Sequence, residues 1–152
     1  MRTVVVGIGN DFRGDDGAGR ETVRLLRTSH PKGVEFIELN GEMMGLLDRL
    51  DDCSTLIVID ATQSQSPAGT IHRFDAGKNP LPDNRGQRST HGISIGSVIE
   101  MARVQHLLPR RVLVFGIEGE TFDHGTPLTP RVKDAVRNLA DEIARDLGSD
   151  AR

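Results

Sequence analysis

Three residues far apart in the sequence have side chains suited to binding a cation: Asp16, Asp60 and His91. Asp16 follows the first apolar run, Asp60 ends the apolar run TLIVID, and His91 follows a long polar segment. Two carboxylates and an imidazole form a mixed oxygen and nitrogen set, which suits a borderline divalent ion such as nickel or zinc. Three protein ligands would leave coordination positions for water or substrate, as a catalytic metal site requires.

Each of these residues also has an ordinary structural role open to it. The Asp60 side chain could cap the turn that follows its strand, and His91 could cap the next helix or bond a backbone carbonyl. Asp15 and Asp16 both lie at an expected helix start, where Asp is a favoured N-cap residue. We assign the cap to Asp15, which leaves Asp16 available for chemistry.

The segment that contains Asp16 reads VVVGIGNDFRGDDGAG over residues 4–19, and its pattern argues against phosphate binding. Phe12 occupies the position of the third glycine in G-x-G-x-x-G, and no Lys follows the glycines as it does in a phosphate-binding loop. Two acids at a helix N-terminus would also repel phosphate. The loop is therefore predicted to attract a cation.

Apolar runs that alternate with helical spacings predict a three-layer α/β/α fold with a mostly parallel, twisted sheet of roughly five strands. We expect strands at 3–8, 34–39, 55–60 and 111–117, with a polar edge strand at 69–74. Residues 75–90 should form a long surface loop. Helical spacing is carried by three sets of apolar residues: Met43, Leu46, Leu47 and Leu50; Ile95, Val98, Ile99 and Ala102; and Val132, Ala135, Val136, Leu139, Ile143 and Leu147. Ligands of such sheets bind outside the carboxyl ends of the parallel strands, so the three candidate ligands should meet there.

Composition limits the class of protein. A length of 152 residues fits one domain spanning 1–152. A net charge of -3, without a Lys/Arg cluster among aromatic residues, argues against a nucleic-acid partner. The sequence shows no signal peptide and no apolar stretch of membrane-spanning length, so no membrane insertion is expected.

The single cysteine, Cys53, cannot form an internal disulfide, which fits a reducing compartment and a cytoplasmic location. We interpret Cys53 as a small core residue. The remaining histidines show no spacing that ties them to an acid and are interpreted as surface or structural residues: His30, His72, His106 and His124.

Four motifs make the sequence similar to the nickel-iron hydrogenase maturation endopeptidases. They are VVGIGNDFRGDDGAG near the start, LIVIDAT at 56–62, STHGISI at 89–95, and VFGIEGE followed by GTPLTPRV near the end. The resemblance covers nearly the whole chain. Two differences from the family pattern concern the choice of substrate: residues 39–42 read LNGE where a D-G-G-T-like turn is common, and Gly119 replaces a common Pro.

The resemblance implies an endopeptidase that removes the C-terminal extension of a hydrogenase large-subunit precursor. Asp16, Asp60 and His91 match the family's metal-binding acid, acid and histidine. Nickel is expected to arrive bound to the precursor and to serve as the recognition handle, and other divalent ions could occupy the same site. Hydrolysis would be either metal-assisted or of an aspartic type with Asp16 or Asp60 as general base, without a covalent intermediate.

Two other functions stay open on the residues alone. One is a non-catalytic α/β module that binds a metal or a nucleotide, although the missing phosphate fingerprint counts against the nucleotide. The other is a small-molecule hydrolase on a related fold. Shortening of the precursor would distinguish the endopeptidase from both.

Overall fold

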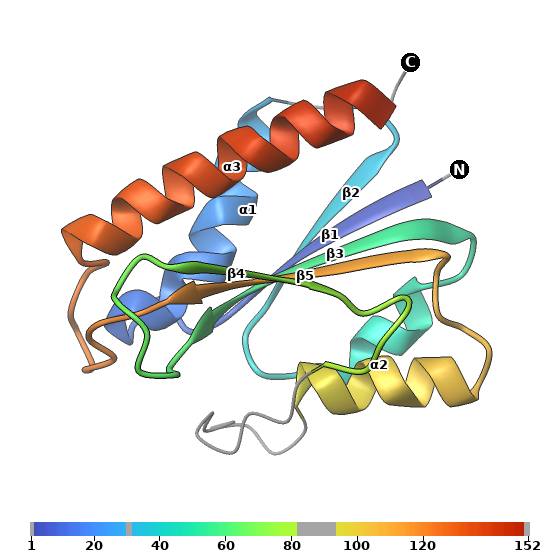
Figure 1. The fold of residues 1–152 in the computed structure, drawn as a ribbon, viewed down its shortest axis with the longest axis horizontal. Coiled ribbons are helices and arrows are strands. Elements are labelled where there is room, and N and C mark those ends of the chain that lie inside the picture. Colours follow the sequence, from blue (N-terminus) through green and yellow to red (C-terminus); the bar gives the residue numbers. More distant parts are fainter. Residues whose placement is uncertain (1, 30–31, 82–93, 151–152) are drawn as a thin grey trace.

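The computed structural model describes residues 2–29, 32–81 and 94–150, which form a sheet between two layers of helices (Figure 1). In this part of the chain the sheet has five strands in the order β2-β1-β3-β5-β4, and only β4 is antiparallel to its neighbour. The strands are β1 (Arg2–Ile8), β2 (Val34–Leu39), β3 (Cys53–Thr62), β4 (Ile71–Asp75) and β5 (Arg111–Glu118). The predicted α/β/α fold with a mostly parallel sheet is confirmed.

Helices cover both faces of the sheet (Figure 1). The helices α1 (Ala18–Thr28) and α3 (Pro130–Asp150) pack on one face. The helix α2 (Ile95–Val104) and the 3-10 helix η2 (Met44–Arg49) pack on the other. A second 3-10 helix, η1 (Gly14–Gly17), joins β1 to α1. None of the helices in the described ranges combines the length and apolar character needed to cross a membrane.

The central strands are buried on both faces because side chains alternate between the two helical layers. Val4 and Val6 contact the layer of α2, and Val5 contacts the layer of α1 and α3. All three valines are inaccessible to solvent. A run of β-branched residues without polar alternation is what a strand with two covered faces requires.

The apolar stripes predicted for the later helices are confirmed. All four stripe residues of α2 and all six of α3 are buried. The stripe at 43–50 forms only six residues of 3-10 helix, with Leu46 buried and Leu47 partly buried against the core. So short a segment has one or two turns, and helical spacing does not distinguish 3-10 from α-helix at that length.

Several boundaries differ from those predicted. The strand β3 continues to Thr62, so Asp60 lies inside the strand and does not end it. The edge strand β4 begins at Ile71 and ends at Asp75. Of the predicted surface loop, only the part up to residue 81 falls within the described residues.

Candidate active site

Asp16 and Asp60 lie close together at the carboxyl edge of the sheet. Asp16 is in η1, which packs against β3, and Asp60 is in β3 itself. Both residues are half-buried. Removal from water, followed by the negative charge of Asp16, raises the pKa of Asp60 from 3.8 to about 7. The two acids predicted to share a site are therefore neighbours.

One oxygen of each carboxylate is held by the backbone. Asp16 Oδ2 accepts a hydrogen bond from the Asn10 N–H at 2.9 Å, and Asp60 Oδ1 accepts one from the Ala61 N–H at 2.8 Å. Within the described residues, no hydrogen bond reaches the second oxygen of either group. Two half-buried carboxylates repel each other, and a cation bound between them would relieve that repulsion. The acid pair therefore fits a metal ion.

The third predicted ligand, His91, lies outside the described residues. Among the described residues, no three His, Cys, Asp or Glu side chains converge into a metal-binding group. The role of His91 stays a prediction from the family motif.

Asp15 does not have the predicted role of helix N-cap. Neither η1, whose N-cap residue is Arg13, nor α1, whose N-cap residue is Gly17, has a side-chain cap. Its carboxylate is inaccessible to solvent and accepts hydrogen bonds from Glu120 N–H, Thr121 N–H, and both the N–H and hydroxyl of Thr129, at 2.7 to 3.1 Å. Asp15 thus ties the turn after β1 to the loop that precedes α3.

Two glycines allow the turn after β1 to pack closely against the backbone at Asp16 and Thr121. Gly9 has φ +148° and Gly14 has φ +56°, which L side chains rarely adopt. A Cβ on Gly9 would lie 1.9 Å from the Asp16 carbonyl oxygen, and one on Gly14 would lie 2.5 Å from the Thr121 carbonyl oxygen. Gly9 and Gly14 therefore allow close backbone packing around Asp16.

The sequence analysis did not identify a further acid that lies beside Asp16 and Asp60. Glu118, at the end of β5, is buried and accepts hydrogen bonds from the Thr62 hydroxyl, the Ser64 N–H and hydroxyl, and His72 Nε2. The His72 Nε2 to Glu118 Oε1 distance is 3.2 Å. No sequence pattern indicated this pairing, and it is compatible with the interpretation of His72 as a surface or structural residue. His106 and His124 are exposed, as predicted, and His30 lies outside the described residues.

A sequence signal for Glu118 was present. It ends the apolar run VLVFGIE, as Asp60 follows the run TLIVI, and an acid at the carboxyl end of a buried strand needs partners. Asp60, Thr62 and Glu118 also share the α2 face of the sheet by strand alternation and register. The Glu118 cluster therefore lies next to the acid pair.

Ser64, His72 and Glu118 do not form a catalytic triad. In a triad the histidine uses one ring nitrogen for the serine and the other for the acid. Here the same atom, His72 Nε2, lies 3.5 Å from Ser64 Oγ and 3.2 Å from Glu118 Oε1, and the serine hydroxyl donates directly to Glu118 at 2.6 Å. His72 is therefore not placed between Ser64 and Glu118 as the general base of a triad.

Cys53 is also unsuited to act as a nucleophile. It begins β3, at the opposite end of this strand from Asp60, and its thiol donates to the Thr55 carbonyl oxygen at 3.1 Å. Burial raises the pKa of the Cys53 thiol, which disfavours the reactive thiolate. Its interpretation as a structural residue agrees with these contacts.

Glu118 makes the stability of the protein depend on pH. Burial alone would raise the pKa of Glu118, but hydrogen bonds from Ser64, Thr62 and His72 outweigh it and lower this pKa below 4.5. A carboxyl group with a lowered pKa stabilises the folded state above its unfolded pKa, and that contribution is lost as pH falls. We expect Glu118→Gln to cost about 1–3 kcal/mol at pH 7 and progressively less below about pH 4.5.

Urea unfolding of the wild type and this variant between pH 3 and pH 7 measures the effect. Glu120→Gln is the matched control, because Glu120 is exposed and two residues away. A stability difference for Glu118→Gln that stays constant over this pH range would contradict the expected linkage.

Comparison with known proteins places the chain in a family. A model of the HycI hydrogenase maturation proteases matches residues 21–146. The hydrogenase expression/formation protein HupD of Thiocapsa roseopersicina is 28% identical over 136 residues, which are 88% of this chain and 62% of that protein. HupD of Rhodobacter capsulatus is 28% identical over 149 residues, which are 96% of this chain and 71% of that protein.

Among solved structures, the hydrogenase maturating endopeptidase HybD of Escherichia coli superposes with a TM-score of 0.81 at 23% identity. The superposition covers 99% of this chain and 94% of HybD, so the two share one fold. The family match spans most of the chain and includes β3 with Asp60. The chain therefore belongs to the hydrogenase maturation proteases, a family of peptidases.

Proposed function

We propose that this protein is an endopeptidase that removes the C-terminal extension from a nickel-loaded hydrogenase large-subunit precursor in the cytoplasm. The observation that carries the proposal is the pairing of Asp16 and Asp60 at the carboxyl edge of the sheet, in a chain that belongs to this protease family. The curated relatives named above are hydrogenase expression/formation proteins, which supports a hydrogenase precursor as the substrate.

The acid pair acts as a receptor for the metal that the precursor carries. Asp16 and Asp60, with His91 from the family motif, supply ligands that complete the coordination of the precursor's nickel. Binding through the metal selects the loaded precursor, because an empty precursor offers nothing to neutralise the two carboxylates. The same contact holds the peptide bond that is to be cut over the carboxyl edge of β1 and β3.

Hydrolysis proceeds by direct addition of water to the peptide carbonyl. The geometry at Ser64 and the position of Cys53 support this route, since Ser64 is not part of a catalytic triad and Cys53 begins β3, far from Asp60 along the strand. The water supplies a hydroxyl group to the new carboxyl terminus of the large subunit, and its remaining proton goes to the amine of the released extension.

The test uses purified protein with the precursor in nickel-loaded and nickel-free forms. Mass spectrometry should show shortening of the loaded precursor and no change in the nickel-free one. Nickel binding without any loss of precursor mass would indicate a delivery module. Hydrolysis of small esters or nucleosides in the absence of precursor would favour a small-molecule hydrolase.

A further inference from the structure

Phe12 is a large, solvent-exposed apolar residue near the candidate active site in the sequence. It is 75% exposed, although only five of the 152 residues are Phe and the chain contains no Trp or Tyr. It lies in the turn between β1 and η1, four residues before Asp16. Exposed aromatic residues are enriched where one protein binds another.

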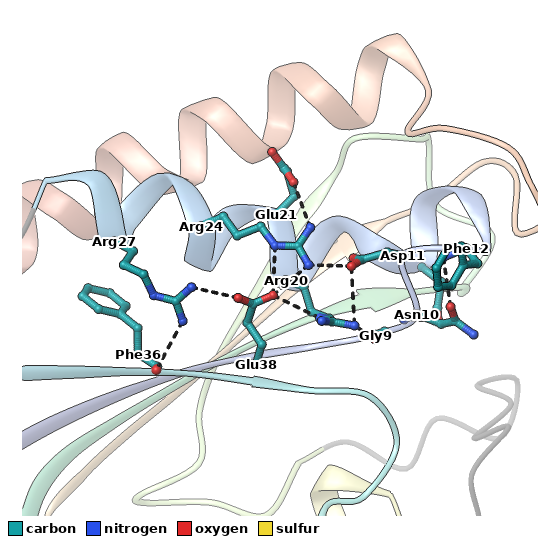
Figure 2. Close-up of polar contacts among 11 residues, drawn as sticks. Gly9, Asn10, Asp11, Phe12, Arg20, Glu21, Arg24, Arg27, Phe36 and Glu38 are labelled. Atoms are coloured by element: carbon teal, nitrogen blue, oxygen red, sulfur yellow. Dashed lines mark hydrogen bonds and ion pairs between the residues drawn. The ribbon is translucent and has the colours of Figure 1, made fainter.

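The turn that presents Phe12 is anchored on both sides of the ring. Phe12 N–H donates to Asn10 Oδ1 at 2.9 Å, and the Phe12 carbonyl accepts from Gly125 N–H at 2.7 Å. The neighbouring Asp11 carboxylate pairs with the guanidinium groups of Arg24 and Arg20 on α1 (Figure 2). The backbone around Phe12 is therefore fixed without any contribution from the phenyl ring.

The same contacts connect Phe12 with the acid pair. Asn10 accepts from Phe12 N–H through its side chain and donates from its own N–H to Asp16 Oδ2, both at 2.9 Å. Asn10 thus hydrogen-bonds both the backbone that carries Phe12 and the carboxylate of a candidate metal ligand. Phe12 is therefore connected to Asp16 through a single intervening residue.

The chemistry of this turn points to an apolar group of a protein substrate. The acidic group next to the ring, Asp11, is already ion-paired within the protein with Arg24 and Arg20, as Figure 2 shows. The phenyl ring itself offers no hydrogen bond. Burial against an apolar side chain of a partner is the contact that this exposed phenyl ring favours.

We infer that Phe12 is a specificity-determining residue that docks an apolar side chain of the precursor close to the bond that is cut. This inference rests on the proposed function, because it takes the precursor as the molecule bound at Asp16 and Asp60. Phe12 contributes binding energy for the precursor and takes no part in the chemical step.

Phe12→Ala should raise the KM for the nickel-loaded precursor by roughly 10- to 100-fold and change kcat less than about twofold, as expected for lost uniform binding of one apolar ring. Phe12→Leu, which restores an apolar surface, should recover most of the wild-type KM. Val104→Ala is the matched control: Val104 is 78% exposed and ends α2, at the opposite edge of the sheet from η1 (Figure 1). It should leave both constants unchanged.

A second measurement separates this inference from the proposed function. The dissociation constant is measured with a nickel-loaded precursor that carries proline after the cut site to resist cleavage. Phe12→Ala should weaken this binding by the same factor as it raises KM. Wild-type affinity in Phe12→Ala would overturn the inference while the proposed function stands. If Phe12→Ala binds the precursor more weakly and the wild type does not cleave it, the proposed endopeptidase function would be wrong and the docking role of Phe12 would stand.

Discussion

Replacing Asp60 with asparagine is expected to lower the rate of precursor cleavage by at least roughly 100-fold and to stabilise the metal-free protein at pH 8. Asparagine has nearly the same shape, and its Oδ1 can still accept the hydrogen bond from Ala61 N–H. The substitution removes the charge that burial and Asp16 disfavour. Function and stability should therefore change in opposite directions.

The stabilisation should depend on pH with a defined sign. The pKa of Asp60 is about 7 in the folded protein and near 3.8 when it is unperturbed. Because the folded state holds this proton more tightly than the unfolded state, the wild type loses stability as pH rises from about 4 to about 7. Asp60→Asn has no carboxyl group to ionise at this position and does not lose this stability. Its Tm should therefore equal that of the wild type at pH 4 and exceed it by about 5 °C at pH 8.

Thermal melts of metal-free protein across this pH range, together with cleavage of nickel-loaded precursor, measure both effects. Asp134→Asn is the matched control, because it removes one negative charge from an exposed position on α3. It should alter neither the pH profile of Tm nor the cleavage rate. If Asp60→Asn cleaves the precursor at the wild-type rate, Asp60 is not part of the active site. A Tm difference that does not change with pH would contradict the raised pKa of Asp60.

Asp15→Ala should be strongly destabilising, by about 3–5 kcal/mol, although the neighbouring Asp16→Asn should not lower the free energy of unfolding. The alanine variant leaves three backbone N–H groups and one hydroxyl without their acceptor in a place that water does not reach. In a domain of this size such a loss corresponds to a fall in Tm of roughly 10 °C.

Urea unfolding followed by circular dichroism compares the two variants directly. Asp16→Asn keeps an acceptor for the Asn10 N–H and loses only a charge at a half-buried position. It should instead lose precursor cleavage, as Asp60→Asn does. A loss of less than about 1 kcal/mol for Asp15→Ala would show that the anchor between the two loops is dispensable.

The fold could be predicted from the sequence because its signals are local. The strand β2 begins and ends at the predicted residues, and the buried stripes of α2 and α3 follow from spacings within each helix. The neighbourhood of Asp16 and Asp60 also followed from the sequence, since parallel strands bring their carboxyl ends to one edge. These inferences needed no knowledge of which distant side chains touch.

What the sequence analysis missed depends on contacts between distant segments. The carboxylate of Asp15 bonds residues that lie 105 to 114 positions later, and no pattern near Asp15 signals them. The preference of Asp for helix N-caps therefore suggested a cap at Asp15. Its hydrogen bonds to distant backbone groups determine its position instead. The pairing of His72 with Glu118 likewise requires the register between β4 and β5, which the sequence alone did not supply.

The anchor at Asp15 also bears on when this enzyme becomes competent during its own synthesis. Ribosomes extend a chain at about 5–20 residues per second, so the turn after β1 waits on the order of 10 s before Thr129 is made. Until then, the loop that buries the Asp15 carboxylate is missing, and the turn that carries the neighbouring Asp16 lacks this anchor. Asp15 therefore gains its hydrogen-bond donors only after β5 has been synthesised.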